Sequence, residues 1–229
     1  MNEIMENLIQ DFCQNLKEMF QERVIFLGLQ GSVGRGEGVD TSDIDIVVIL
    51  DQLGIEDLVQ YRNLIDQSPE PVKMCGFISG VNELYHWEKS DLFQFYYDSQ
   101  PIFGSINFIK PMLSKMDVRR AVLIGACNIY HSCGHNFVHE KSGEVLKSCY
   151  KSAFFVLQAK YFDLTGFYVQ KKTDLLPRLS LDDRKILEIL MSPIKWNCLD
   201  EVTFQTCSDA LIKWAGKLIE DFSISQENN

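Results

Sequence analysis

The 229-residue sequence lacks the features that mark several classes of protein. No window approaches 18 unbroken apolar residues, so a membrane-spanning helix is not expected. The seven cysteines are odd in number and include no CxxC pair, which argues against a zinc ribbon or a disulfide framework and favours reduced, mostly buried thiols. No basic stretch followed by an apolar block opens the sequence, so we expect no secretory signal and a cytoplasmic protein.

Positive charge is scarce in the first half of the chain. Residues 1–110 carry seven lysine and arginine side chains against 18 aspartate and glutamate side chains, whereas residues 111–229 carry 15 and 14. Binding of long nucleic acids needs many basic side chains at the phosphates, and the first half cannot supply them. Its negative field favours metal ions or a small amine-bearing molecule as partners.

The hydrophobic pattern changes near Pro111. Before it, short apolar runs typical of strands alternate with helical patterns; the predicted helices cover residues 4–20, 55–65 and 81–98, and the predicted extended segments cover 24–29, 43–50, 72–78 and 101–109. After it, long helical patterns dominate. We therefore predict two domains, residues 1–110 with strands and helices and residues 111–229 with helices alone.

The stretch between the first two predicted strands carries a specific pattern of chemistry. An apolar strand runs into Gly31-Ser32, a glycine-rich turn follows, and the next strand begins with Asp43 and Asp45. Side chains two residues apart on a strand share a face, so the two carboxylates should lie together. Adjacent carboxylates repel unless a cation lies between them, and Mg²⁺ takes oxygen ligands together with water and substrate phosphates. The Gly-Ser backbone and the guanidinium of Arg35 would face those phosphates.

This pattern, Gly-Ser, ten residues and then Asp-x-Asp, resembles the signature of the DNA polymerase β-like nucleotidyltransferases. It is similar to the minimal nucleotidyltransferases and to the aminoglycoside and lincosamide nucleotidyltransferases. The resemblance implies an α+β fold, in which a small mixed sheet with flanking helices precedes a helical bundle. It also implies a nucleoside triphosphate substrate and two Mg²⁺ ions. The residues implied are catalytic, metal-binding carboxylates at Asp43 and Asp45, and nucleotide-binding groups at Gly31, Ser32, Arg35 and Ser42.

The same family supplies a third carboxylate from a later strand, beside the pair. The predicted strand over residues 72–78 contains no acid. The acids that flank it are Glu70, Glu83, Glu88, Asp91 and Asp98. Spacing does not show that any of these folds back to the pair. The third acid could also come from the helical half or from another subunit, and otherwise the metal site is incomplete.

The helical half resembles the bundles of kanamycin nucleotidyltransferase and of the HEPN family. In the antibiotic-modifying relatives this domain supplies an acidic base and a lysine to the cleft. The resemblance makes Glu140 the candidate catalytic base, and Lys147 and Lys151 candidates for binding the phosphates. HEPN ribonucleases carry an arginine four to six residues before a histidine. Here Gly134 stands five residues before His139, so we expect no ribonuclease activity.

Three histidines of the helical half, His131, His135 and His139, recur every four residues, so one helical face can carry all three. Imidazoles suit zinc, but neither HExxH nor a supporting cysteine pair is present. The alternative is a polar stripe in which each ring is hydrogen-bonded.

Three functions fit these features. The preferred one is Mg²⁺-dependent transfer of a nucleoside monophosphate from a triphosphate such as ATP to a hydroxyl of a small, amine-bearing, antibiotic-like acceptor. The second is a protein nucleotidyltransferase or antitoxin-like protein that modifies a partner. The third, favoured by the missing acid, is a nucleotide-binding protein without turnover. A homodimer is compatible with all three, and we expect neither long nucleic acid nor a membrane as a partner.

Overall fold

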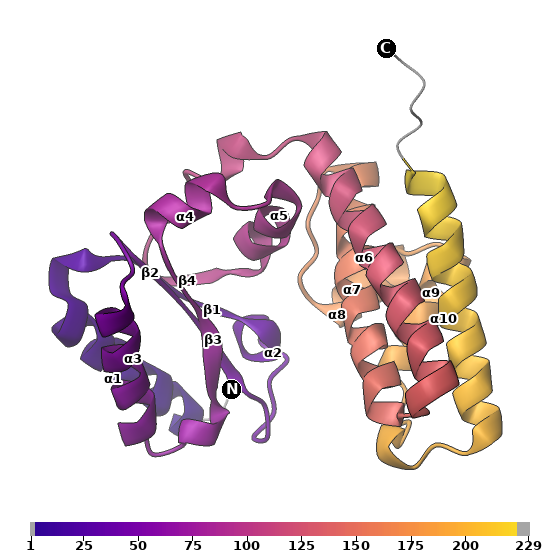
Figure 1. Ribbon diagram of the computed structural model, residues 1–229, viewed down its shortest axis with the longest axis horizontal. Coiled ribbons are helices and arrows are strands. Elements are labelled where there is room, and N and C mark those ends of the chain that lie inside the picture. The colour runs from indigo at the N-terminus through magenta and orange to yellow at the C-terminus, as the bar shows by residue number, and fades with distance from the viewer. Residues whose placement is uncertain (1–2, 224–229) are drawn as a thin grey trace. The chain divides into compact units, whose positions relative to one another are not determined.

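The computed structural model describes residues 3–223, which form two compact units divided between Leu113 and Ser114 (Figure 1). The sequence pattern predicted a boundary between residues 110 and 111. All strands of the described chain belong to the first unit, called unit 1, and unit 2 is helical. The predicted α+β fold class, a small mixed sheet with flanking helices followed by a helical region, is confirmed. Within residues 3–223, every helix is too short or too polar to cross a membrane.

A four-stranded sheet with the order β3-β2-β1-β4 forms the centre of unit 1. Its strands are β1 (Val24–Gln30), β2 (Ile44–Leu50), β3 (Met74–Gly80) and β4 (Gln100–Gly104). Strand β1 pairs antiparallel with β2 and β4, whereas β3 runs parallel to β2. The β-branched run of β2 is almost entirely buried, as expected for an inner strand covered on both faces.

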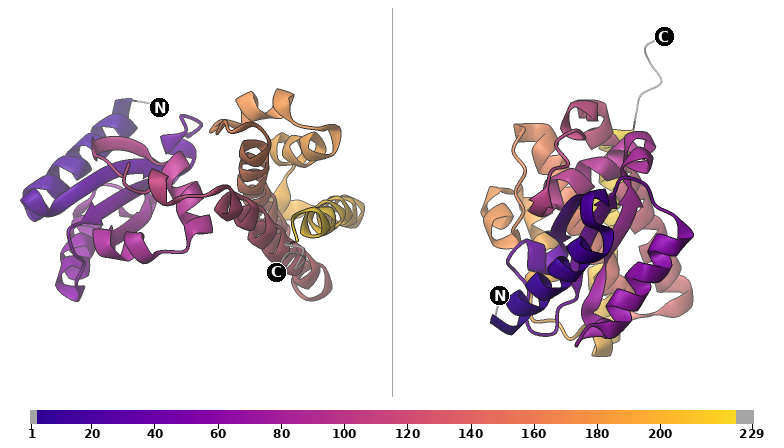
Figure 2. Two further views of the ribbon diagram at one scale, coloured as in Figure 1. Left: turned by 90° about the horizontal axis from the view of Figure 1, so that it is seen from above. Right: turned by 90° about the vertical axis from the view of Figure 1, so that its left-hand side faces the viewer.

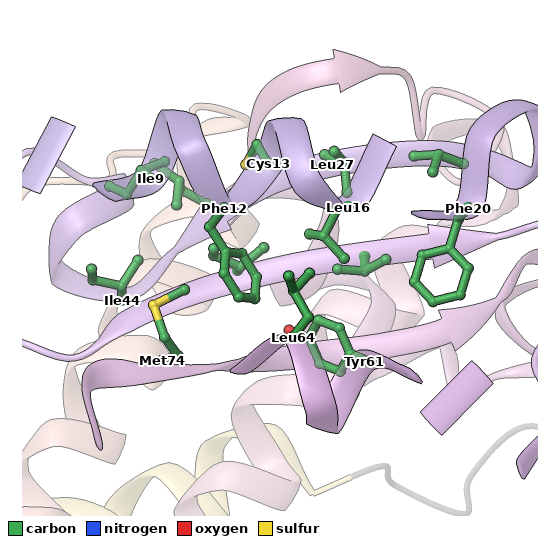
Figure 3. Packing of buried hydrophobic residues seen from close by; sticks show 14 of the residues in the cluster. Ile9, Phe12, Cys13, Leu16, Phe20, Leu27, Ile44, Tyr61, Leu64 and Met74 are labelled. Carbon is green, nitrogen blue, oxygen red and sulfur yellow. The ribbon is translucent and has the colours of Figure 1, made fainter. Parts of the chain in front are cut away.

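Helices α1 (Glu3–Phe20) and α3 (Ile55–Gln67) cover one face of this sheet (Figure 3). The apolar residues of α1 recur with helical period, so one stripe is buried and the opposite face is solvated. Figure 3 shows Phe12 and Leu16 of α1 pointing into the cluster, with Tyr61 of α3 beneath. The rings of Phe12 and Tyr61 meet edge to face, with their centroids 6.2 Å apart.

Helices α4 (Val81–His86) and α5 (Lys89–Asp98) cover the other face. The sequence pattern predicted a single helical stretch over residues 81–98, but the backbone is extended at Trp87 and α5 begins anew. The N–H groups of the first turn of α5 bond to the carbonyl of Glu88, which restarts the helix. The buried residues on this face are Phe26, Val47, Ile49, Leu84, Leu92, Ile106 and Ile109.

In unit 2 the long helices α6 (Lys115–His135), α7 (Gly143–Thr165) and α10 (Glu201–Phe222) pack side by side (Figure 2). The shorter helices are α8 (Lys172–Leu175) and α9 (Leu181–Met191). Helices α6, α7, α9 and α10 each begin with a side chain that accepts the N–H three residues further on: Ser114, Ser142, Ser180 and Asp200. Such caps satisfy otherwise unpaired donors at a helix start.

A buried carboxylate joins three helices of unit 2. Asp183 of α9 is 4% exposed and accepts two bonds from the ammonium of Lys160 of α7, at 2.8 and 2.7 Å. It also accepts the indole N–H of Trp214 of α10 at 2.9 Å. We call this arrangement the Asp183 node. Because charged and polar partners converge on one buried carboxylate, the packing of the three helices depends on it.

Candidate active site

The predicted acidic pair lies where β2 begins and β1 ends. Asp45 pairs in register with Gln30 of β1 and with Cys75 of β3. Asp43 directly precedes the strand and is exposed, whereas Asp45 is partly buried. Residues two apart on a strand share a face, so Asp45 lies on the same face as Val47, which packs beneath α4 and α5. The pair therefore sits at one end of the sheet, with Asp45 on the face that α5 covers.

Gly31 lies directly against the carboxylate of Asp45. Its φ of +65° is left-handed, and a Cβ at this position would overlap the Oδ2 atom of Asp45. The short helix α2 (Gly31–Gly34) begins here, and the N–H of Glu37 bonds to the carbonyl of Ser32 at 2.8 Å, which closes the turn. Both the backbone conformation and the close approach require glycine. The Gly-Ser turn and the Asp-x-Asp motif thus form one site.

Changing Gly31 to alanine is expected to disrupt this site. The left-handed conformation alone costs a non-glycine residue about 1–3 kcal/mol, and the new methyl group would displace the Asp45 carboxylate. We expect a lower midpoint of thermal unfolding and loss of triphosphate binding, measured by calorimetry.

The matched control is Gly134→Ala in α6, where a Cβ meets no atom within 4 Å. That change should stabilise the helix by about 0.5–1 kcal/mol and leave triphosphate binding intact. A Gly31→Ala protein with unchanged melting and binding would contradict the requirement for glycine.

Arg35 lies inside the turn. Its side chain is 6% exposed, and its Nη1 and Nε donate to Oδ2 of Asp98 at 2.8 Å and to Oε2 of Glu37 at 3.3 Å. The sequence predicted that this guanidinium faces the nucleotide phosphates. A phosphate would have to compete with two carboxylates for a group that solvent barely reaches.

Asp98, the last residue of α5, reaches the Gly-Ser turn from the helix that covers this face. It is 4% exposed and accepts the bond from Nη1 of Arg35 at 2.8 Å. The predicted contact of the Gly31 N–H with a phosphate stays a prediction. Burial raises the pKa of Asp98 and the charge of Asp45 raises it further, while Arg35 and the Gly31 N–H oppose the increase.

A second contact joins the end of β1 to the end of α5. The side-chain amide of Gln30 donates to the hydroxyl of Ser99 at 2.9 Å and to the carbonyl of Phe95 at 3.2 Å. Gln30 could not be singled out from the sequence, because its partners are remote in the chain. We call the three residues at this end of α5, Phe95, Asp98 and Ser99, the α5 latch.

Cys75 occupies the position on β3 next to Asp45, where the family resemblance leads one to expect a third acid. Partial desolvation raises the pKa of this thiol against the influence of the Gly76 N–H, and the carboxylates of Asp45 and Asp43 raise it further. The neighbour of the pair on β3 is therefore a neutral thiol. It is one of three exposed cysteines, Cys75, Cys127 and Cys198, whereas the other four are buried.

Ser42 closes the loop that leads into β2. Its hydroxyl accepts the N–H of Val39 at 2.9 Å, and its own N–H returns to the carbonyl of Val39 at 2.8 Å. This geometry fixes the approach to Asp43. The predicted contact of Ser42 with a nucleotide stays a prediction.

The remaining predicted residues belong to unit 2. Glu140 ends a short π-helical turn (Asn136–Glu140) and is exposed, with its Oε1 3.2 Å from Nδ1 of His135. Lys151 is exposed on α7, and Lys147 lies 3.8 Å from the carboxylate of Glu144. Their proposed roles as base and phosphate ligands stay predictions.

The three histidines line one stretch of the surface of unit 2. The ring centroids of His131 and His135 are 6.3 Å apart, and those of His135 and His139 are 4.7 Å apart. Across residues 3–223, however, no group of three or more His, Cys, Asp or Glu side chains is placed to hold a metal ion. The geometry thus gives the zinc alternative no support.

Comparison with known proteins agrees with this geometry. Residues 6–79 match the family model of the nucleotidyltransferase domain. The fold is similar to that of spectinomycin adenyltransferase AAD(9) from Enterococcus faecialis, solved with ATP and spectinomycin. The TM-score is 0.51 at 16% identity, over 90% of this chain and 98% of that one.

A nucleotidyltransferase-like protein from Exiguobacterium sibiricum aligns over 93% of this chain and 75% of its own, with a TM-score of 0.33 and 8% identity. No curated protein matches the sequence. The match over residues 6–79 spans the Gly-Ser turn and the acidic pair, so the chain carries a nucleotidyltransferase domain in unit 1.

Proposed function

We propose that this protein transfers a nucleoside monophosphate from a nucleoside triphosphate to a hydroxyl group of a small, amine-bearing acceptor. The observation that carries the proposal is the contact between Gly31 and Asp45, which joins the Gly-Ser turn to the acidic pair. The acceptor class is supported by the likeness of fold to a protein solved with ATP and spectinomycin. The excess of acidic side chains in residues 1–110 also favours a cationic acceptor.

The residues present fit Mg²⁺. Asp43 and Asp45 offer only carboxylate oxygens, and glycine at position 31 leaves room for the Asp45 carboxylate. Mg²⁺ prefers such oxygens and is commonly held by one or two carboxylates plus water and substrate phosphates, so two protein ligands suffice. Asp43 and Asp45 would hold the metal. When bound, the metal would supply positive charge that neutralises charge on the triphosphate.

The other residues would bind and orient the reactants. Gly31 gives the turn its shape, and the backbone and hydroxyl of Ser32 would face the triphosphate. Ser42 holds the loop before Asp43. On the family resemblance, Glu140 takes the proton of the acceptor hydroxyl and Lys151 binds a phosphate.

A second candidate function is nucleotide binding without turnover. It is favoured by Cys75, which puts a thiol where the family supplies a third carboxylate. A neutral thiol adds no negative charge to hold a metal ion, so this site would be slower than one with three acids.

The test combines binding and turnover. Calorimetry should show ATP binding that requires Mg²⁺ and is lost in EDTA. Pyrophosphate release should then appear with at least one member of a panel of aminocyclitols, including spectinomycin, and simple amino alcohols. Binding without release for any acceptor would favour the second candidate. Absence of ATP binding in Mg²⁺ would contradict both candidates.

A further inference from the structure

We propose that Asp98 is a positioning residue for triphosphate binding, which holds the Gly-Ser turn in its binding conformation through its ion pair with Arg35. The proposal rests on the proposed function, because it concerns the same site. It adds a residue outside the region that matches the family model, which ends at residue 79.

The ion pair of Asp98 fixes the end of the turn. Its carboxylate accepts from the guanidinium of Arg35, which directly follows α2. A charge-assisted pair at 2.8 Å between two side chains that are each 6% exposed is held firmly. Loss of the carboxylate would loosen the backbone of the turn that contains Ser32.

Helix α5 and its contact with β1 hold Asp98 in place. It ends α5, and Ser99, the next residue, bonds to Gln30 at the end of β1. The α5 latch thus contacts Gln30 before α2 and Arg35 after it. A triphosphate would have to move α5 in order to displace Asp98, so the carboxylate acts as a fixed support for the turn and not as a stand-in for a phosphate.

One oxygen of this carboxylate supports a role beyond packing. The Oδ1 atom of Asp98 is buried and has no hydrogen-bond partner among the described residues. An unpaired buried acceptor opposes folding. An asparagine could accept the bond from Arg35 without a buried negative charge, but it would not supply the charge that holds the guanidinium. The charge is therefore best explained by its effect on Arg35 and on the turn.

The experiment compares Asp98→Asn with Asp57→Asn in the full chain. Asp57 is a matched control because it is also buried, pairs with Arg23 at 2.7 Å and accepts the N–H of Gly54 at 2.9 Å. It lies near Arg23 and Asp51, at the opposite end of β1 and β2 from the acidic pair. Both changes should lower the midpoint of thermal unfolding.

Only Asp98→Asn should raise the dissociation constant for ATP with Mg²⁺, by about tenfold, which corresponds to roughly 1.4 kcal/mol. Only this change should speed amide hydrogen exchange at residues 32–35. Equal affinities of a folded Asp98→Asn protein and the wild type would overturn the proposal. Tighter binding would also overturn it, because it would show that Asp98 competes with the triphosphate. An equal loss of affinity in Asp57→Asn would reduce the effect to general destabilisation.

If Asp98→Asn does not fold, Arg35→Lys tests the same contact with the charges kept. A lysine cannot reproduce the fixed geometry of the guanidinium, so the dissociation constant should again rise, and an unchanged constant would overturn the proposal. The wild-type measurement separates the two claims. Failure of the wild type to bind ATP removes the proposed function and this inference together, whereas normal binding by both proteins removes only the inference.

Discussion

Replacing Asp45 with asparagine is expected to lower the rate of nucleotidyl transfer by about 10³-fold. The carboxylate lies against Gly31 at the centre of the site, and the proposed reaction depends on neutralising charge on the triphosphate. Asparagine has the same shape but no charge, so the fold should survive. Pyrophosphate release with a saturating acceptor gives the rate, and thermal unfolding checks that the protein is intact.

The control for this change is Asp51→Asn, beyond the other end of the same strand. Asp51 is partly exposed and pairs with Arg23 at 3.1 Å, far along β2 from the acidic pair. Its loss should change the rate by less than about twofold. A rate for Asp45→Asn within about tenfold of the wild type would contradict the assignment of Asp45 as a metal ligand.

Replacing Asp183 with alanine is expected to lower the free energy of unfolding by about 3–5 kcal/mol. The change leaves the ammonium of Lys160 and the indole N–H of Trp214 without their shared acceptor inside unit 2. Removing one member of a buried ion pair is far more damaging than the pair itself is stabilising. Urea unfolding followed by tryptophan fluorescence measures the loss.

The adjacent residue provides the comparison. Asp182 lies on the surface, with its side chain 67% exposed and 3.3 Å from the ammonium of Lys217. Asp182→Ala should change the free energy of unfolding by at most about 0.5 kcal/mol, because exposed ion pairs contribute little. Similar effects for both variants would show that the Asp183 node does not hold the helices together.

The fold was largely predictable because its signals are local. Runs of β-branched and apolar residues marked β1 and β2, and helical periodicity marked α1 and the helices of unit 2. The break between α4 and α5 was not predicted. The aromatic residues around Trp87 continue the apolar pattern across the break, whereas the restart of α5 depends on backbone bonds to Glu88 that leave little trace in the sequence.

The residues of the candidate site were likewise predictable only in part. Asp43 and Asp45 could be singled out because their spacing on a strand sets a shared face, and Gly31 because it belongs to the Gly-Ser turn that precedes them. The partner of Arg35 was not, since Asp98 lies 63 residues further along the chain. Asp98 was only one of several acids that flank the predicted strand over residues 72–78. Neither periodicity nor spacing distinguishes an acid that folds back onto a turn from an acid in solvent.

Strand β4 limits how far the Gly-Ser turn and the Asp-x-Asp motif can be separated from the rest of unit 1. It starts two residues after Asp98 and pairs with β1, where Gln100 is in register with Leu29. A fragment ending at residue 79 would turn β1 into an unpaired edge, exposing its N–H and C=O groups to other chains. It would also leave the guanidinium of Arg35 without its partner Asp98. The motif therefore depends on β4 and on Asp98, and a fragment that preserves it must extend at least through Gly104.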